Sequence, residues 1–195
     1  LEEFVPFDSE ASIVMVSDGR KVVSFPVGRN IHRDGILDLC IVPSGADPQV
    51  LARMKAESER FMRDCGYEGI LAIEYFIRGD AIYFNEMAPR PHNSGHYTIE
   101  GATTNQFREL VRYLVGEPLQ EPRLVAPTVM KNILGQDLEA AGCGEPAGCI
   151  CPSLRQDRKS SQAQDGAYYF CRYGCRELRR GMGRKICKIS ANKIK

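Results

Sequence analysis

The sequence lacks any run of about 18 apolar residues, the length that a membrane-spanning helix requires, so no membrane partner is expected. Its first residues, LEEFVPF, show no basic stretch followed by an apolar core, which argues against a secretory signal peptide. The chain also lacks an initial Met and opens on a strand-like pattern, so we expect that it was cut from something longer. A net charge of +1 favours no nucleic acid or other charged partner.

No histidine occurs after His96, and the composition changes sharply near residue 143. Residues 143–195 hold 12 Lys and Arg against 4 Asp and Glu, together with six of the eight cysteines. Residues 1–142 are acidic instead, with 14 basic and 21 acidic groups. We therefore divide the chain into a domain at 1–140 and a separate tail at 141–195.

Along the domain, the pattern of expected elements is strands, helix, hairpin, helix, strand. This order predicts an α+β fold with a mainly antiparallel sheet and flanking helices. A helix should begin at Asp47 and end at Gly66, and a second should follow the cap at Asn105 and end near Gly116. The buried face of the first helix should hold Val50, Leu51, Met54, Phe61, Met62 and Cys65. Strands are expected at 1–5, 12–17, 21–27, 70–77, 81–84 and 129–134, with loops at 28–46 and 88–101.

Two carboxylates interrupt apolar strands on the two arms of the 70–84 hairpin. Glu74 and Glu86 can face the same side, and Asn85 adds a neutral oxygen beside them. Two carboxylates and an amide oxygen suit octahedral Mg²⁺ with bound phosphates. From spacing alone, two partly exposed strand carboxylates without a ligand remain an alternative.

The densest polar cluster is the loop Arg90-Pro91-His92-Asn93-Ser94-Gly95-His96. Such a proline-stiffened loop can bind anionic oxygens, although a plain surface loop is the alternative. A zinc site is not favoured, because the two histidines have no obvious third ligand nearby. By their pattern alone, Glu2, Glu3 and Glu10 are exposed strand charges and His32 is a loop histidine.

The run from Asn85 to Thr98, NEMAPRPHNSGHYT, closely resembles the N-E-x-A-P-R-x-H-N-S-G-H-x-T signature of the N5-carboxyaminoimidazole ribonucleotide synthases, members of the ATP-grasp superfamily. Shorter similarities lie at 3–5, 26–37, 106–107 and 129–135, so the resemblance covers roughly residues 1–140. It implies an ATP-dependent carboxylation of 5-aminoimidazole ribonucleotide by bicarbonate, through carboxyphosphate, in purine biosynthesis. It also implies a cytoplasmic enzyme and a homodimer.

The resemblance also assigns roles to residues. Glu2, Glu3, Phe4 and Val5 would run along the adenine, Glu10 would bind the ribose hydroxyls, and His32 would be another nucleotide contact. Glu74 and Glu86 match Mg²⁺ ligands, with Asn85 alongside as a further contact of the bound nucleotide. The catalytic residues would be Arg90 and His92, and the substrate would contact Arg90, His92, Asn93, Ser94 and His96.

Two departures from the family put the activity of this chain in question. Compared with the family, the sequence shows neither a preceding domain nor a phosphate-binding Lys with a Gly-rich loop. We therefore expect that about half of a full enzyme is missing. The tail lacks the family's final pattern, H-x-Y-G-K-x-E-x-R-P-x-R-K-M-G-H. When permitted codons for residues 152–167 are read one base out of frame, they yield LHFGKTESRPKRKMGH, in which that pattern returns. We therefore expect a single-base frameshift between about Gly135 and Cys149, and an irregular or disordered tail beyond it.

Three other interpretations stay open. The Cys-rich basic tail, with Cys149, Cys151, Cys171 and Cys175, can be taken as a small zinc-binding or nucleic-acid-binding module. The domain can belong to another ATP-grasp ligase, such as a formate-dependent transformylase. The chain can also be a fragment without activity. Disulfides are not expected, because the domain resembles a cytosolic enzyme.

Overall fold

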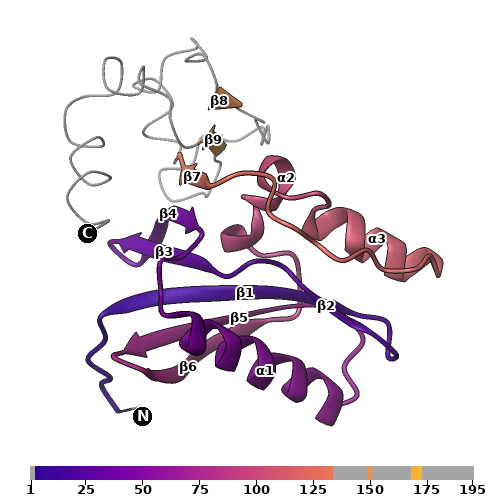
Figure 1. Ribbon diagram of the computed structural model, residues 1–195, viewed down its shortest axis with the longest axis horizontal. Helices are drawn as coiled ribbons and strands as arrows, with labels where there is room; N and C mark the ends of the chain where they lie inside the picture. The colour runs from indigo at the N-terminus through magenta and orange to yellow at the C-terminus, as the bar shows by residue number, and fades with distance from the viewer. Residues whose placement is uncertain (1–2, 134–148, 151–167, 173–195) are drawn as a thin grey trace.

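The computed structural model describes residues 3–133, 149–150 and 168–172. Its centre is a nine-stranded sheet in which every pair of neighbouring strands is antiparallel (Figure 1). The strand order is β6-β5-β1-β3-β4-β7-β9-β8, and β2 pairs with β1. The expected α+β class with a mainly antiparallel sheet is confirmed. No helix in the described part is long and apolar enough to cross a bilayer.

The strands are β1 (Ser9–Ser17), β2 (Val22–Ser24), β3 (Gly28–Arg33), β4 (Ile36–Val42), β5 (Gly69–Arg78), β6 (Ala81–Ala88), β7 (Thr128–Asn132), β8 (Cys149–Ile150) and β9 (Tyr168–Arg172). The helices are α1 (Pro48–Asp64), α2 (Thr98–Gly101) and α3 (Gln106–Val115), with a 3₁₀ turn, η1, at Asn93–Gly95. The prediction of a long loop at 28–46 is wrong, since β3 and β4 form a hairpin there. Its turn is made by Asp34 and Gly35, both with positive φ, a conformation that suits a tight two-residue turn.

Two more expectations about strands need correction. The expected strand at 1–5 is absent over its described residues, 3–5, which carry no regular structure. In the tail, the seven residues of β8 and β9 are strands instead of irregular chain, and β9 pairs with β7. The other tail residues, and with them the frameshift and its expected disorder, lie outside the described residues.

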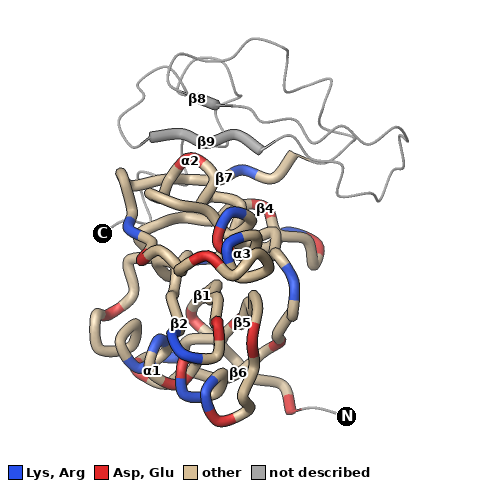
Figure 2. The backbone as a smooth tube through the Cα atoms, turned by 90° about the vertical axis from the view of Figure 1, so that its right-hand side faces the viewer, with Lys and Arg blue, Asp and Glu red and all other residues tan. Residues whose placement is uncertain are grey.

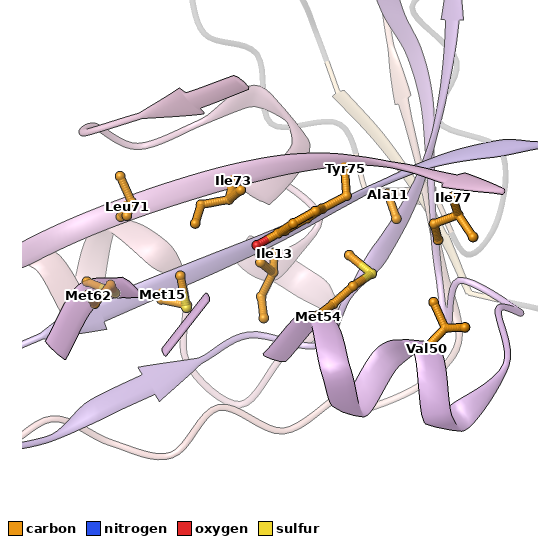
Figure 3. Close-up of a cluster of buried hydrophobic side chains, with 10 residues drawn as sticks. All are labelled: Ala11, Ile13, Met15, Val50, Met54, Met62, Leu71, Ile73, Tyr75 and Ile77. Carbon is orange, nitrogen blue, oxygen red and sulfur yellow. The ribbon is translucent and has the colours of Figure 1, made fainter. Parts of the chain in front are cut away.

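Helix α1 covers one face of the sheet, as the close-up of the core shows (Figure 3). Asp47 caps it by accepting a hydrogen bond from the backbone N–H of Gln49, and a proline at the first helical position favours the same start. Its buried residues are Val50, Met54, Ser58 and Met62, so the predicted face is right in part. Phe61 and Cys65 were expected inside but are exposed. Figure 2 shows acidic and basic residues interleaved along this helix.

The opposite face of the sheet changes character along its strands. Near α3 it is apolar, because Val14, Val16, Ile70 and Ala72 pack with Leu110 and Tyr113 of that helix region. Further along the same rows the side chains are polar, since Ser12 lies opposite Glu74 in the pairing of β1 with β5. Alternation in a strand keeps residues i and i+2 on one face. The polar cluster therefore continues the α3 face of the core.

Candidate active site

Glu74 and Glu86 lie directly opposite each other in the antiparallel pairing of β5 with β6. A bulge follows Glu74, because Tyr75 pairs with Phe84 and leaves Asn85 as the extra residue of β6. Glu74 is buried, whereas Asn85 and Glu86 are exposed. The prediction that the two carboxylates share one side of the hairpin is confirmed in its geometry.

His92 joins these carboxylates, which the sequence did not indicate. One ligand atom from each of Glu74, Glu86 and His92 lies within 4.8 Å of the others, so the three can surround one ion. His96 is not part of this group, so the described residues do not place both histidines of the loop with a third ligand. Two carboxylates suit a hard cation such as Mg²⁺ better than a zinc ion, which prefers nitrogen and sulfur ligands.

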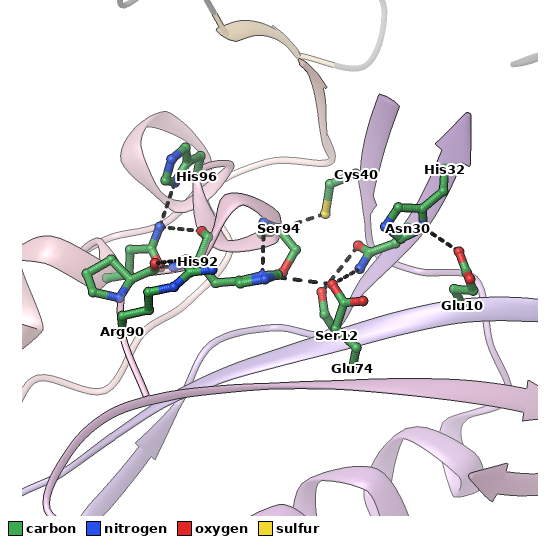
Figure 4. A network of polar contacts seen from close by, with 12 residues as sticks. Glu10, Ser12, Asn30, His32, Cys40, Glu74, Arg90, His92, Ser94 and His96 are labelled. Atoms are coloured by element: carbon green, nitrogen blue, oxygen red, sulfur yellow. Dashed lines mark hydrogen bonds and ion pairs between the residues drawn. The ribbon is translucent and has the colours of Figure 1, made fainter. Parts of the chain in front are cut away.

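Glu74 receives a hydrogen bond from Asn30 of β3, two strands away in the sheet (Figure 4). The Nδ2 atom of Asn30 donates to Oε1 of Glu74 at 3.2 Å, and the hydroxyl of Ser12 donates to Oδ1 of Asn30 at 3.2 Å. The pKa of Glu74 is raised to about 7, chiefly by burial; the nearby His32 opposes this rise, and Glu86 and Glu10 support it. Burial thus disfavours the charged form of this carboxyl group, and a nearby cation would stabilise it.

The Arg90–His96 loop lies over these strands. The Nδ1 atom of His92 is 2.9 Å from the hydroxyl of Ser94 and 3.8 Å from Oε1 of Glu74. Burial lowers the pKa of His92, and the positive charge of Arg90 lowers it further. The contact with Glu74 thus joins a neutral imidazole to the carboxyl group and is no salt bridge at neutral pH.

The other loop residues differ in how they are placed. Arg90 is exposed, and its guanidinium donates to the backbone carbonyl of Pro91 at 3.0 Å. Ser94 is buried, with its carbonyl 3.4 Å from the thiol of Cys40. Among the described residues, the buried Oδ1 atom of Asn93 has no hydrogen-bond partner. Arg90 and Asn93 thus each have hydrogen-bonding capacity that a ligand can use.

A second polar pair lies on the neighbouring strands. The Nδ1 atom of His32 contacts Oε2 of Glu10, which brings together two residues predicted to bind the nucleotide. The hydrogen bond to Glu10 raises the pKa of His32, burial opposes that rise, and the charges of Glu10, Glu74 and Glu86 support it. This pair therefore adjoins the same acidic cluster.

The predicted adenine segment is only partly described. Glu2 lies outside the described residues, while Glu3 and Phe4 are exposed and Val5 is half-buried. Phe4 is 84% exposed, so the described part of the chain does not cover it. The segment stays ordered against the sheet further on, where Phe7 stacks on Phe76 with ring centroids 4.4 Å apart.

Three positioning residues were missed from the sequence. Ser12 and Asn30 orient Glu74, and Gln106 of α3 binds the backbone of the loop at His92. Asn30 and Gln106 stand inside short runs that resemble the family, which is the signal that was available. Their roles depend on contacts between distant segments, so no local pattern displays them.

Comparison with known proteins identifies the family of this chain. The ATP-grasp domain family matches residues 1–107, more than half of the chain. The chain belongs to the ATP-grasp family. It is 41% identical over 154 residues to N5-carboxyaminoimidazole ribonucleotide synthase of Vibrio cholerae, covering 76% of this chain and 39% of that protein. The Escherichia coli synthase is 37% identical over 144 residues, with 71% and 39% covered.

Solved structures of the same synthases share the fold of this ATP-grasp chain. An ADP complex of the synthetase matches with a TM-score of 0.82 at 35% identity, covering 86% of this chain and 46% of that one. The Staphylococcus aureus enzyme with ADP matches with a TM-score of 0.82 at 26% identity, covering 97% and 51%. The chain thus spans about two fifths of the length of its curated relatives and about half of these structures.

Proposed function

We propose that the protein to which this ATP-grasp chain belongs carboxylates 5-aminoimidazole ribonucleotide to N5-carboxyaminoimidazole ribonucleotide, using ATP and bicarbonate. The observation that supports this most is the meeting of Glu74 and Glu86 beneath the Arg90–His96 loop. The relatives at 37–41% identity carry the name of this synthase.

In the proposed reaction, a bicarbonate oxygen attacks the γ-phosphorus of ATP and the bond to the β-phosphate oxygen breaks. This gives ADP and carboxyphosphate. The 5-amino group of the ribonucleotide then attacks the carboxyl carbon, loses a proton, and phosphate leaves. Negative charge moves between oxygens in both steps, so the chemistry depends on fixed positive charge and on exclusion of water.

Glu74 and Glu86 would hold Mg²⁺, with Asn85 alongside. Their carboxylates fit a hard cation, and the pKa of Glu74, raised by burial, would fall as an ion binds. When bound, Mg²⁺ neutralises charge on the phosphates. The chain's own contribution is to orient Glu74 through Asn30 and to keep the carboxylate pair together across the hairpin.

The loop would act on the reacting groups. Arg90, exposed beside the cluster, would bind an anionic oxygen of phosphate or carboxyphosphate. Burial lowers the pKa of His92 and favours its neutral form, which can accept a proton. Asn93, Ser94 and His96 complete the proposed substrate contacts. Glu10 and His32 would bind the nucleotide, together with residues 2–5.

The location and assembly belong to the same proposal. A cytoplasmic place and a homodimer are properties that the resemblance implies. An exposed apolar row on α3 supports assembly in part, since Val111, Leu114 and Val115 are each more than half exposed. Sedimentation of the purified complete protein would show whether it is a dimer.

The test is an assay of the complete gene product for ADP release that requires both bicarbonate and aminoimidazole ribonucleotide. A Glu86→Gln variant keeps the size of the side chain and removes the charge, so it should reduce the rate at least a hundredfold. An exposed carboxylate of α1, changed by Glu57→Gln, is the matched control. Turnover with formate in place of bicarbonate would instead identify a transformylase. Sequencing the DNA for residues 135–167 tests the frameshift in the same gene.

A further inference from the structure

Gln106, the first residue of α3, is completely buried against the loop at residues 92–96. Its Oε1 atom accepts a hydrogen bond from the backbone N–H of His92 at 2.9 Å. Its Nε2 atom donates to the backbone carbonyl of His92 at 2.8 Å. The same nitrogen lies 2.7 Å from Nδ1 of His96. One side chain thus joins three points of the loop to the start of a helix.

These contacts admit only one orientation of the amide. A backbone N–H can only donate and a carbonyl can only accept. If the carboxamide of Gln106 were turned over, donor would face donor and acceptor would face acceptor at His92. The atom beside His96 is therefore the NH₂ group, and one of its two hydrogens is already used by the carbonyl of His92.

The second hydrogen of the Gln106 amide determines the tautomer of His96. An amide nitrogen has no lone pair to offer, so Nδ1 of His96 must be the acceptor in this contact. A neutral imidazole that accepts at Nδ1 carries its proton on Nε2. Burial, with a smaller contribution from His92, lowers the pKa of His96 to about 4, so the ring is neutral at physiological pH.

Packing leaves Gln106 little freedom to move away. A Cβ atom placed on Gly95 would stand 2.5 Å from Oε1 of Gln106, so the turn passes as close as a residue without a side chain allows. The hydroxyl of Thr98 donates to the carbonyl of Gly95 at 2.6 Å and accepts from the backbone N–H of Gln106 at 3.2 Å. Thr98 is also fully buried.

We propose that Gln106 is a positioning residue that fixes the loop at His92 and holds His96 in the tautomer with its proton on Nε2. The proton of the neutral ring then lies on the nitrogen that does not face Gln106. The link to catalysis rests on the proposed function, but the tautomer does not.

The direct test is ¹⁵N NMR of the 195-residue chain labelled at histidine, at neutral pH. Unprotonated Nδ1 and protonated Nε2 of His96 are expected, whereas protonated Nδ1 would overturn the proposal. In Gln106→Glu, which keeps the acceptor and loses both N–H donors, the proton should move to Nδ1. Glu109→Gln makes the reverse change at a buried site of the same helix, where the partners are Thr104, Arg112 and Gln120, and should leave His96 unchanged.

If Gln106→Glu does not fold, the wild-type spectrum alone decides the tautomer, and Gly95→Ala serves as a second variant that displaces the amide. In the complete protein, Gln106→Glu should lower kcat at least tenfold and change KM for ATP less than threefold. A tenfold rise in KM with an unchanged kcat would contradict the positioning role. Absent carboxylation in the wild type, together with the expected tautomer, would reject the proposed function and leave this inference intact.

Discussion

Asn30 donates a hydrogen bond to Glu74 across the intervening strand β1. A side chain of β3 thus orients a carboxylate of β5. Both groups are buried, at 3% and 7% exposure, so water does not replace the bond if it is lost. The pair connects the core of the sheet to the proposed cation site. It also gives the first of five predictions.

Replacing Asn30 with Leu should destabilise the fold by about 2 kcal/mol at pH 8, because a hydrogen bond to a buried charged group is lost. At pH 5 the carboxyl of Glu74 is protonated and the cost should fall to about 1 kcal/mol. Ser12→Ala is the matched control, since Ser12 contacts Asn30 but not Glu74 and its effect should not vary with pH. Urea unfolding at both pH values measures the difference, and equal pH behaviour of the two variants would contradict the prediction.

The raised pKa of Glu74 predicts that this residue destabilises the folded chain by an amount that depends on pH. Between pH 4.5 and about 7 the folded chain binds a proton that the unfolded chain releases, so this group makes stability fall as pH rises. Glu74→Gln should therefore be as stable as the wild type below pH 4.5 and more stable by about 3 kcal/mol above pH 7. Added Mg²⁺ should reduce this difference by stabilising the wild type alone.

His96 should act in the opposite direction over nearly the same range. Its lowered pKa of about 4 means that the unfolded chain binds the extra proton below pH 6.5, so stability rises with pH there. The two slopes partly cancel in the wild type. Unfolding of Glu74→Gln between pH 4 and 7 should reveal the rising slope of His96, and a flat profile would show that His96 is not buried as described.

The pair of Glu10 and His32 predicts a shift that can be observed directly. Glu10→Gln should lower the pKa of His32, because the hydrogen bond to Glu10 is the largest cause of its rise. Stability from this pair is present below pH 6.5 and is lost as pH rises through the raised pKa of His32. In a proton NMR titration, Glu74→Gln should lower the pKa of His32 by less, since it acts only through space. The reverse order of effects would contradict the contact.

Helix α1 offers a comparison of two large apolar residues in one element. Met54 is fully buried in the core, and Phe61 is 38% exposed. Met54→Ala should cost about 2–5 kcal/mol by removing packed atoms and leaving a cavity, whereas Phe61→Ala should cost about 1 kcal/mol. Thermal or urea unfolding of both variants measures this. Similar losses would mean that Phe61 is covered in the intact protein.

Much of the domain could be predicted from local pattern. The cap at Asp47, the helix end at Gly116 and the Gly79 turn between two apolar strands each have a short-range cause, so α1, α3 and the β5–β6 hairpin were expected correctly. The β3–β4 hairpin was missed because its strands mix charged and apolar residues without clean alternation. Its pairing partners, β1 and β7, come from distant parts of the chain.

The sequence by itself determined the antiparallel hairpin that sets Glu74 against Glu86, because both strands and their turn are contiguous. It also determined the resemblance carried by the Arg90–His96 loop. Only the tertiary structure decided that Asn30 orients Glu74, that His92 joins the carboxylates, and that Gln106 holds the loop. Those contacts join residues 14 to 44 positions apart, and only packing of the sheet and α3 brings them within hydrogen-bond distance.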